Sequence, residues 1–256
     1  MHDAPGAADR PPIAAWQALS LVDYPGSLSC VLFFAGCNFR CPFCHNPELV
    51  LPGARRRHTV PWEHVEAQWR ERRGFLDAVT LSGGEPTLHD GLPAALHRIR
   101  AAGLRVKLDT NGSRPDVVEG LIECGVLDYV AVDVKAPWRR YAELAGVAVD
   151  VHRIQRTIEV IGHSHVEYEL RTTVAPTLSE QDVKEIAAQL SGARRYVLQT
   201  FVPRVGEGLL DPSWSSRPAL DGATLHRLWK RIAVRFGDGG VRGAAQPQRV
   251  SAEADA

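Results

Sequence analysis

Residues 36–47 read Gly-Cys-Asn-Phe-Arg-Cys-Pro-Phe-Cys-His-Asn-Pro, and this stretch places Cys37, Cys41 and Cys44 within eight residues. A strand-like apolar run, 31–35, comes just before it, and Gly36 lets the backbone turn as it leaves that run. Three thiolates on one loop are soft ligands, which suit an iron-sulfur cluster or zinc. The stretch therefore predicts a metal site directly after a buried strand.

Other interpretations of the cysteine loop remain open at this point. Zinc would need a closed fourth ligand, which His45 could supply, but structural zinc sites prefer paired and separated cysteine knuckles. Residues 41–45 also match the Cys-x-x-Cys-His pattern of haem attachment, which requires an exported protein, and residues 1–15 contain no apolar run of signal-peptide length. Three unrelated core cysteines are a further interpretation, which their grouping on one loop disfavours.

Short β-branched or aromatic runs alternate with segments of helical spacing along the chain. The expected strands are residues 31–35, 78–82, 105–110, 129–134, 167–174 and 196–201. The expected helices are residues 61–73, 92–102, 115–124, 151–161, 179–190 and 221–236. This alternation predicts βαβ units and a parallel sheet covered on both faces, either doubly wound or curved into a partial (β/α)6 barrel.

Length and composition limit the classes of protein to consider. At 256 residues the chain suits one core, with residues 16–236 as a single domain between flexible tails, 1–15 and 237–256. Lys and Arg together number 30, as do Asp and Glu, so the net charge of zero disfavours a nucleic-acid partner. No window approaches the roughly 18 continuous apolar residues of a membrane span. Five cysteines, an odd number, suit a metal in a reducing compartment, so we expect a cytoplasmic protein with no membrane partner.

Glycines and charged residues follow the later strands. The run at 78–82 leads into Gly83-Gly84-Glu85, whose glycines expose backbone groups to a ligand. The next two strands end in Asp109-Thr110-Asn111 and Asp133-Val134-Lys135. Each of these charges alone could be a cap or a surface group. Because the carboxyl ends of parallel strands meet at one edge, we expect them to surround a charged ligand beside the cysteines.

The Cys-x3-Cys-x2-Cys spacing resembles the radical S-adenosylmethionine (SAM) superfamily. In that superfamily three cysteines bind three irons of one 4Fe-4S cluster, and the fourth iron takes the amino and carboxylate groups of SAM. Gly83, Gly84 and Glu85 resemble the motif that grips the SAM amino group, and Phe43 matches the aromatic residue beside the adenine. The resemblance implies a partial (β/α)6 radical SAM barrel with Cys37, Cys41 and Cys44 as the iron ligands.

Further segments resemble the glycyl-radical-enzyme activating enzymes, with the activating proteins of anaerobic ribonucleoside-triphosphate reductase as the most similar branch. These segments are residues 21–26, 36–47, 109–112 and 133–135, within a resemblance from about Ser20 to Pro203. The resemblance implies an oxidoreductase that reductively cleaves SAM to a 5′-deoxyadenosyl radical and removes a hydrogen atom from a glycine of a partner enzyme. It also implies an electron donor such as flavodoxin or ferredoxin.

The pyruvate formate-lyase branch of this family implies roles for single residues. Residues matching Asp109 and Lys135 contact the methionyl part of SAM there, and those matching Asp109, Thr110 and Asp133 help to hold a monovalent cation. In place of a SAM-contacting histidine of that branch, this chain has Gln199. The expected SAM-binding residues are Phe43, Ser82, Gly83, Gly84, Glu85, Asp109, Asn111, Asp133, Lys135 and Gln199.

Two residues match positions that face the partner's target peptide in that branch. They are Asp23 and Arg171, which are expected to bind the partner here; a turn-capping Asp and an exposed Arg are the alternative. Two cysteines lie outside the loop, Cys30 and Cys124, and are expected to be small apolar fillers.

Two other functions remain as alternatives. One is a radical SAM enzyme that acts on a small molecule, as in deazapurine biosynthesis, and the Cys-His-Asn run with Asp23 argues against it. The other is a non-catalytic iron-sulfur carrier, for which the glycine turn and the charged strand ends would have no purpose.

Overall fold

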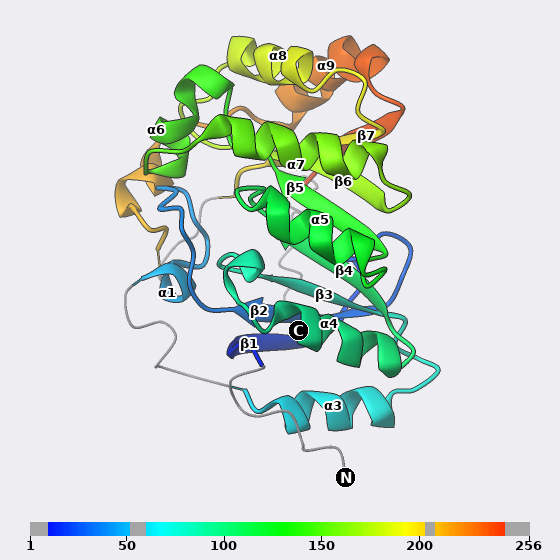
Figure 1. The fold of residues 1–256 in the computed structure, drawn as a ribbon. Coiled ribbons are helices and arrows are strands. Elements are labelled where there is room, and N and C mark those ends of the chain that lie inside the picture. The colour runs from blue at the N-terminus through cyan, green and yellow to red at the C-terminus, as the bar shows by residue number, and fades with distance from the viewer. Residues whose placement is uncertain (1–9, 52–59, 203–207, 244–256) are drawn as a thin grey trace, which may run out of the picture.

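The computed structural model describes residues 10–51, 60–202 and 208–243, and its centre is one eight-stranded sheet in the order β1-β2-β3-β4-β5-β6-β7-β8 (Figure 1). Strand β1 pairs antiparallel with β2, and each later neighbouring pair is parallel. The strands are β1 Ile13–Ser20, β2 Ser29–Phe34, β3 Ala78–Gly83, β4 Arg105–Thr110, β5 Tyr129–Asp133, β6 Glu167–Val174, β7 Arg195–Thr200 and β8 Asp238–Arg242.

Helices connect the parallel strands, and Figure 1 shows α4, α5 and α7 on the same side of the sheet. The helices are α1 Pro47–Val50, α3 Trp62–Glu71, α4 Leu92–Ala101, α5 Pro115–Glu123, α6 Tyr141–Ala145, α7 Val151–His163, α8 Glu180–Gln189 and α9 Gly222–Ile232. Local sequence sets their ends: α8, for example, begins at a capping box of Ser179 and Asp182.

The two faces of the sheet differ in chemistry because successive side chains of a strand point to opposite sides. Val106 and Leu108 of β4 belong to the hydrophobic core that the helices cover. We call the opposite side the inner face; it carries Lys107, Asp109, Asp133, Glu169 and Arg171, which contact one another. The sheet is thus apolar on its helix-covered face and charged on its inner face, so a polar ligand would bind at the inner face.

The prediction of a partial α/β barrel is confirmed: the sheet is mostly parallel and is not closed. All six expected strands and six expected helices are present within a few residues of their predicted bounds. The tail boundaries need correction, because β1 begins at Ile13 and β8 lies within 237–256. Both strands are hydrogen-bonded to the sheet. The rest of those segments, 1–9 and 244–256, lies outside the described residues.

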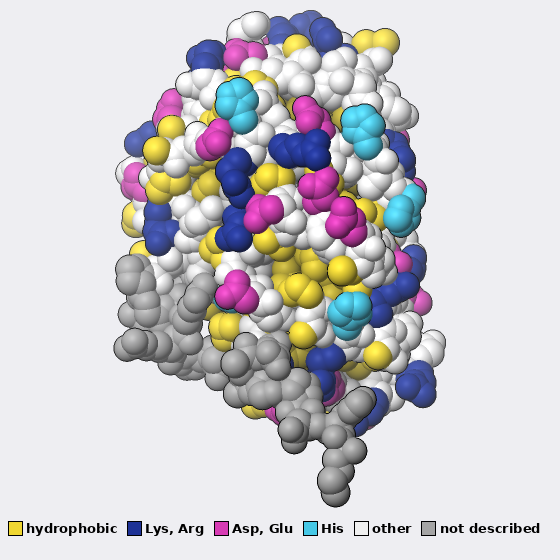
Figure 2. Space-filling model, viewed as in Figure 1, with side chains coloured by type: hydrophobic (Ala, Val, Ile, Leu, Met, Phe, Trp, Pro, Cys, Tyr) yellow, Lys and Arg dark blue, Asp and Glu magenta, His cyan; other side chains and the backbone are white. Residues whose placement is uncertain are grey.

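The helical face of the molecule carries charges of both signs. Figure 2 shows Lys and Arg interspersed with Asp and Glu over this face, and two ion pairs there join α7 to α5, Arg153 with Asp116 and Arg156 with Glu119. Within the described part of the chain, no helix has the length and apolar character needed to cross a membrane.

Candidate functional site

The cysteine loop and the carboxyl ends of β3, β4 and β5 enclose one cavity. Cys37, Cys41 and Cys44 line it from the segment that follows β2. Of the ten residues expected to bind SAM, all but Gln199 also line it: Phe43, Ser82, Gly83, Gly84, Glu85, Asp109, Asn111, Asp133 and Lys135. The structure therefore brings together residues that are up to about a hundred positions apart in the sequence.

Backbone contacts hold the start of the cysteine loop against β3. The amide of Gly84 donates to the carbonyl of Phe34 at 2.8 Å, and the amide of Glu85 donates to the carbonyl of Gly36 at 2.8 Å. A Cβ atom on Gly84 would overlap the carbonyl of Gly36, next to Cys37. Gly84 thus has a role that its sequence pattern does not reveal: it lets β3 approach the cysteine loop.

The middle of the loop rests on α6. The amide of Arg40 donates to the carbonyl of Ala145 at 2.7 Å, and the guanidinium of Arg40 donates to the carbonyl of Cys37 at 2.7 Å. Gly146 has a φ of 69°, and a side chain there would overlap the carbonyl of Arg40. Arg40 and Gly146 were not identified from the sequence, since only the fold shows that α6 ends beneath this loop.

Glu85 is a buried carboxylate that ties β3 to β4. One oxygen accepts hydrogen bonds from the hydroxyls of Thr87 and Thr110, at 2.6 and 2.7 Å, and the other accepts from the amide of Asn111 at 2.7 Å. Only 1% of the residue is exposed, and burial raises the pKa of its carboxyl despite these donors. Contact of this carboxylate with SAM stays a prediction, whereas its bonds within the protein show that it shapes the cavity wall.

Asn111 links the end of β4 to the cysteine loop. Its side-chain amide donates to the side-chain oxygen of Asn38 at 2.9 Å, and Asn38 donates to the hydroxyl of Ser113 at 2.8 Å. Asn38 was missed in the sequence, where it stands inside the motif without a pattern of its own. These bonds orient the loop between Cys37 and Cys41 relative to the strand ends.

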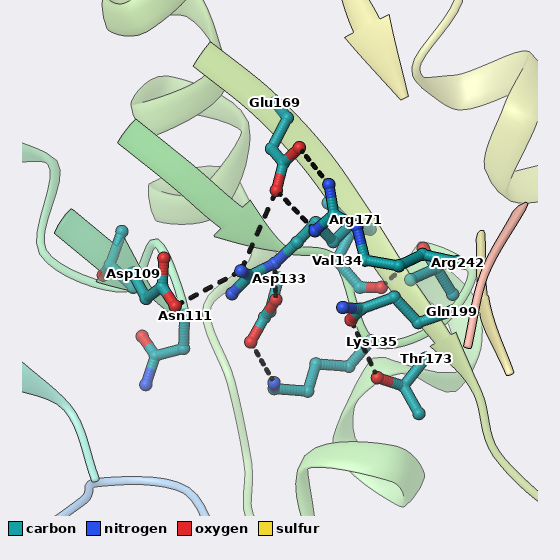
Figure 3. Close-up of polar contacts among 12 residues, drawn as sticks. Asp109, Asn111, Asp133, Val134, Lys135, Glu169, Arg171, Thr173, Gln199 and Arg242 are labelled. Atoms are coloured by element: carbon teal, nitrogen blue, oxygen red, sulfur yellow. Dashed lines mark hydrogen bonds and ion pairs between the residues drawn. The ribbon is translucent and has the colours of Figure 1, made fainter. Parts of the chain in front are cut away.

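Asp109 and Asp133 lie in a network of opposite charges at the ends of β4 and β5 (Figure 3). The oxygens of Asp109 pair with Lys107 at 2.6 Å and Arg171 at 3.2 Å, and those of Asp133 pair with Arg171 at 2.8 Å and Lys135 at 3.3 Å. Burial raises the pKa of both carboxyls, but Arg171 and the nearby lysines outweigh it and lower the net value. Both carboxylates are therefore ionised.

Lys135 is the cation nearest the cysteines among the predicted residues. Burial opposes its charge, but the Asp133 carboxylate outweighs burial and raises the pKa of Lys135 above its usual value. The ammonium thus stays charged and faces a cavity that three cysteine sulfurs also line. A positive group there suits an anionic ligand such as a carboxylate or an iron-sulfur cluster.

Arg171 is buried and not an exposed surface residue. Its side chain is 10% exposed, and its guanidinium donates to both Asp133 and Asp109. Its expected contact with a partner stays a prediction, but any such contact would have to coexist with these two ion pairs. A change at Arg171 would also disturb the two carboxylates of the cavity.

Asp23 lies far from the cysteines along the sheet. It follows Ser20, which pairs with Ser29 at the start of β2, whereas Cys37 follows the end of β2. Its carboxylate accepts a hydrogen bond from the hydroxyl of Ser20, and the backbone amide of Asp23 donates back to that hydroxyl at 3.2 Å. Asp23 therefore caps a turn beside the amino-terminal end of β2. Its contact with a partner stays a prediction.

Aromatic residues cover the far end of the cysteine loop. The ring of Phe43 lies 5.9 Å from that of the buried Trp214, so Phe43 both packs in the core and lines the cavity. His45 stacks on Phe201, and its Nε2 lies 2.9 Å from the carbonyl of Val202. Gln199 does not line the cavity; its side-chain oxygen accepts from Thr173 at 3.3 Å. Its expected contact with the SAM ribose stays a prediction.

The donor set favours a cluster over a single zinc ion. Over the described ranges, no three His, Cys, Asp or Glu side chains come close enough together to share one metal ion, and His45 is directed to Val202. Burial raises the pKa of Cys37 to about 11 and that of Cys41 to about 12, so a metal must displace these protons on binding. With Lys135 as counter-charge, the three thiols fit a 4Fe-4S cluster.

The other two cysteines differ from each other. Cys30 is fully buried and accepts a hydrogen bond from the indole of Trp69 at 3.3 Å, which agrees with a small core residue. Cys124 is exposed at the end of α5, so the expectation of an apolar filler is wrong there. The helical period placed it near a helix end but could not show that this end faces solvent.

Comparison with known proteins places the chain in a family. The model of the Radical SAM superfamily matches residues 31–190. A protein of Methanocaldococcus jannaschii named "Putative glycyl-radical enzyme activating enzyme" is 36% identical over 192 residues, which are 73% of this chain and 78% of that protein. The pyruvate formate-lyase 1-activating enzyme of Escherichia coli is 31% identical over 179 residues, which are 66% of this chain and 70% of the relative.

Solved structures agree on the fold. SuiB of Streptococcus suis, bound to its precursor peptide SuiA, superposes with a TM-score of 0.64 at 16% identity over 84% of this chain and 48% of SuiB. The coproporphyrinogen III oxidase of Escherichia coli gives a TM-score of 0.57 at 11% identity over 84% of this chain and 54% of that enzyme. This chain spans about half the length of each. From the family match, the curated relatives and the site together, the chain belongs to the radical SAM superfamily and, within it, to the glycyl-radical-enzyme activating enzymes.

Proposed function

We propose that this protein reductively cleaves SAM and removes a hydrogen atom from a glycine of a partner glycyl radical enzyme. One observation carries the proposal: three cysteines, a glycine turn and the half-buried Lys135, from separate segments, line one cavity. A carrier of electrons would need only the cysteines. The other groups supply a place for a charged organic cofactor beside the cluster.

The chain's own residues have separable tasks in this reaction. Cys37, Cys41 and Cys44 would hold the cluster, which supplies one electron when it is bound. Lys135, fixed by Asp133, offers a charged donor for the carboxylate of SAM. The turn at Gly83 and Gly84 brings backbone groups to the cavity without a side chain in the way. Placement of the sulfonium beside the cluster, with water kept away, is the protein's contribution.

The predicted cofactor set also includes a monovalent cation at Asp109, Thr110 and Asp133. The two carboxylates already face three cations, Lys107, Lys135 and Arg171. An added cation would have to compete with these side chains, so the charge balance does not favour it. Titration of SAM affinity with sodium and potassium salts against a choline control would decide, because a bound cation should strengthen SAM binding.

We propose anaerobic ribonucleoside-triphosphate reductase as the partner, with flavodoxin or ferredoxin as the electron donor in the cytosol. The support is the resemblance of residues 21–26, 36–47, 109–112 and 133–135 to the activating proteins of that enzyme. Pyruvate formate-lyase is the second candidate, because an activating enzyme of that system is 31% identical. Anaerobic incubation of the reconstituted protein with each partner, SAM and a reductant should give a glycyl radical signal by electron paramagnetic resonance. No signal with either partner would contradict the proposal.

A small-molecule substrate is the competing function. A 7-carboxy-7-deazaguanine synthase of Methanothermobacter thermautotrophicus is 34% identical over 102 residues, which are 40% of this chain and 39% of that enzyme. The origin of the abstracted hydrogen separates the two functions. A partner prepared with deuterated glycine should transfer deuterium to 5′-deoxyadenosine, whereas turnover of a deazapurine precursor without any partner would favour the small molecule.

A further inference from the structure

Glu169 is a carboxylate on the inner face with no solvent exposure, and the last strand of the sheet neutralises it. The guanidinium of Arg242, from β8, makes two bonds to it, at 3.0 and 2.9 Å (Figure 3). The hydroxyl of Tyr129 adds a third contact at 3.3 Å. Burial raises the pKa of Glu169, but the Arg242 bonds and Arg171 outweigh it and lower the net value, so the group is ionised.

Arg171 lies within reach of this same carboxylate. Its guanidinium is 3.9 Å from Glu169, yet its hydrogen bonds go the other way, to Asp133 at 2.8 Å and Asp109 at 3.2 Å. Figure 3 shows Arg171 between Glu169 and these two carboxylates. Three carboxylates, of which Glu169 is fully buried and Asp133 is one-third exposed, thus surround one guanidinium. The carboxylates that Arg171 pairs with depend on the other cations nearby.

We infer that Arg242 is a positioning residue: by neutralising Glu169, it leaves Arg171 to hold Asp109 and Asp133 in the geometry of the SAM cavity. The inference rests on the proposed function insofar as the cavity binds SAM. It assigns a role to β8, a segment that does not itself line the cavity. Asp109 and Asp133 in turn fix the positions of Lys107 and Lys135 through ion pairs. A change at Arg242 would therefore reach the SAM cavity through these two ion pairs.

Loss of Arg242 would leave a buried carboxylate in need of a cation. Arg195 is another cation beside Glu169: its buried Nε lies 3.5 Å away and has no hydrogen-bond partner among the described residues, while its terminal nitrogen is bound to Asp238 at 2.6 Å. Arg195 and Arg171 are therefore the two groups that can move to Glu169, because an unpaired buried charge is more costly than a rearranged ion pair. The inference requires that Arg171 moves, which would release Asp109 and Asp133.

Four cluster-loaded proteins test the inference: wild type, Arg242→Met, Glu169→Gln and the double variant. Calorimetry should show about tenfold weaker SAM binding for Arg242→Met, a change of about 1.4 kcal/mol. Glu169→Gln should stay within about threefold of wild type, since Arg171 keeps both partners. The double variant should recover to within about threefold, because it has no carboxylate to draw Arg171 away. Arg242→Lys, which keeps the charge, should resemble wild type.

The outcomes separate a positioning role from a merely structural one. Unchanged SAM affinity in Arg242→Met, or a double variant as weak as Arg242→Met, overturns the inference, because undocking of β8 would not be rescued by Glu169→Gln. Iron content and melting temperature serve as controls for cluster and fold. Crystal structures of the four proteins, determined without SAM, would show the position of the Arg171 side chain. If wild type binds no SAM, the proposed function fails, and the inference is then judged by whether Arg171 turns to Glu169 in Arg242→Met.

Discussion

Gly84 and Gly36 are packed backbone to backbone, so that the carbonyl oxygen of Gly36 occupies the place where a side chain on Gly84 would begin. The end of β3 and the start of the cysteine loop are thus fitted to each other. The sequence predicts that Gly84 binds SAM, but its contact with Gly36 lies one residue from Cys37, a predicted iron ligand. A side chain here would displace the loop before it affected the cofactor.

The variant Gly84→Ala should therefore lose iron as well as SAM binding. The added methyl group meets backbone atoms, which cannot rotate away as a side chain could, so the loop that carries Cys37 must shift. We expect the iron content after reconstitution to fall by more than half. Gly120→Ala is the matched control, because that position in α5 has open space and should keep full iron. A Gly84→Ala protein with a complete cluster would refute this account of the glycine.

The three loop cysteines should be individually required for the cluster. Cys37→Ala, Cys41→Ala and Cys44→Ala should each lose the cluster and all SAM cleavage, since a cubane held by three thiolates has no spare ligand. Iron analysis and the yield of 5′-deoxyadenosine are the measurements. Cys30→Ala and Cys124→Ala should retain both, one being a core residue bonded to Trp69 and the other an exposed helix end. Full iron in Cys41→Ala would invalidate the site.

Lys135→Met should keep the cluster but weaken SAM binding. The substitution preserves most of the apolar stem and removes the ammonium that faces the cavity. Loss of a charged hydrogen bond of about 1.5–3 kcal/mol corresponds to roughly ten- to a hundredfold in the dissociation constant, measured by calorimetry. Lys230→Met, at the exposed end of α9, is the control and should bind SAM normally. Equal SAM affinity in Lys135→Met and Lys230→Met would show that Lys135 does not contribute to SAM binding.

Glu85→Gln should destabilise the fold itself. Glu85 accepts from two hydroxyls and a backbone amide in the interior, and an amide side chain would turn an NH2 group toward at least one of these donors. We expect a loss of about 1–3 kcal/mol in the free energy of unfolding, measured by urea titration of the cluster-free protein. Glu119→Gln, which breaks the largely exposed pair with Arg156, should cost less than about 0.5 kcal/mol. A Glu85→Gln protein as stable as this control would show that the buried bonds contribute little.

Asp23→Asn should separate partner recognition from cofactor chemistry. The asparagine oxygen can still accept from Ser20, so the turn is kept while the charge is lost. If Asp23 binds the partner, glycyl radical formation should fall about tenfold at limiting partner, while SAM cleavage without partner is unchanged. Arg171→Ala is a poorer test, because it also removes the ion pairs to Asp109 and Asp133. A parallel fall of both rates in Asp23→Asn would assign this residue to the fold.

The sequence predicted those parts of the structure that depend on neighbouring residues. Six parallel strands follow from local patterns of apolar residues and are confirmed. The cysteines predicted from their spacing to share one site line one cavity, whereas their role as metal ligands stays a prediction. Strand β8 was missed because Asp-Gly-Gly-Val-Arg has low strand propensity. Its Gly239 is needed for another reason: a side chain there would overlap the carbonyl of Tyr196 in β7. Only the assembled sheet contains that information.

Ion pairs between distant strands were also beyond the sequence. Asp109 and Lys135 could be assigned to the site because the carboxyl ends of parallel strands converge. The partners of Arg171 could not, since they come from β4 and β5, and the residue that neutralises Glu169 lies 73 positions away in β8. Charged residues spaced along a sequence give no indication of which of them will share one buried face.

The two edges of the sheet, β1 and β8, stay apart, as in the described part of the chain no strand pairs one with the other. A closed barrel could be entered only through its two ends, so a long polypeptide would have to be threaded by a free terminus. A sheet with a seam can instead receive a bend of chain from the side, while both arms of that bend stay attached to a folded body. For a protein substrate this means that a glycine far from either terminus can be presented by swinging out one loop, and the rest of the partner can keep its structure.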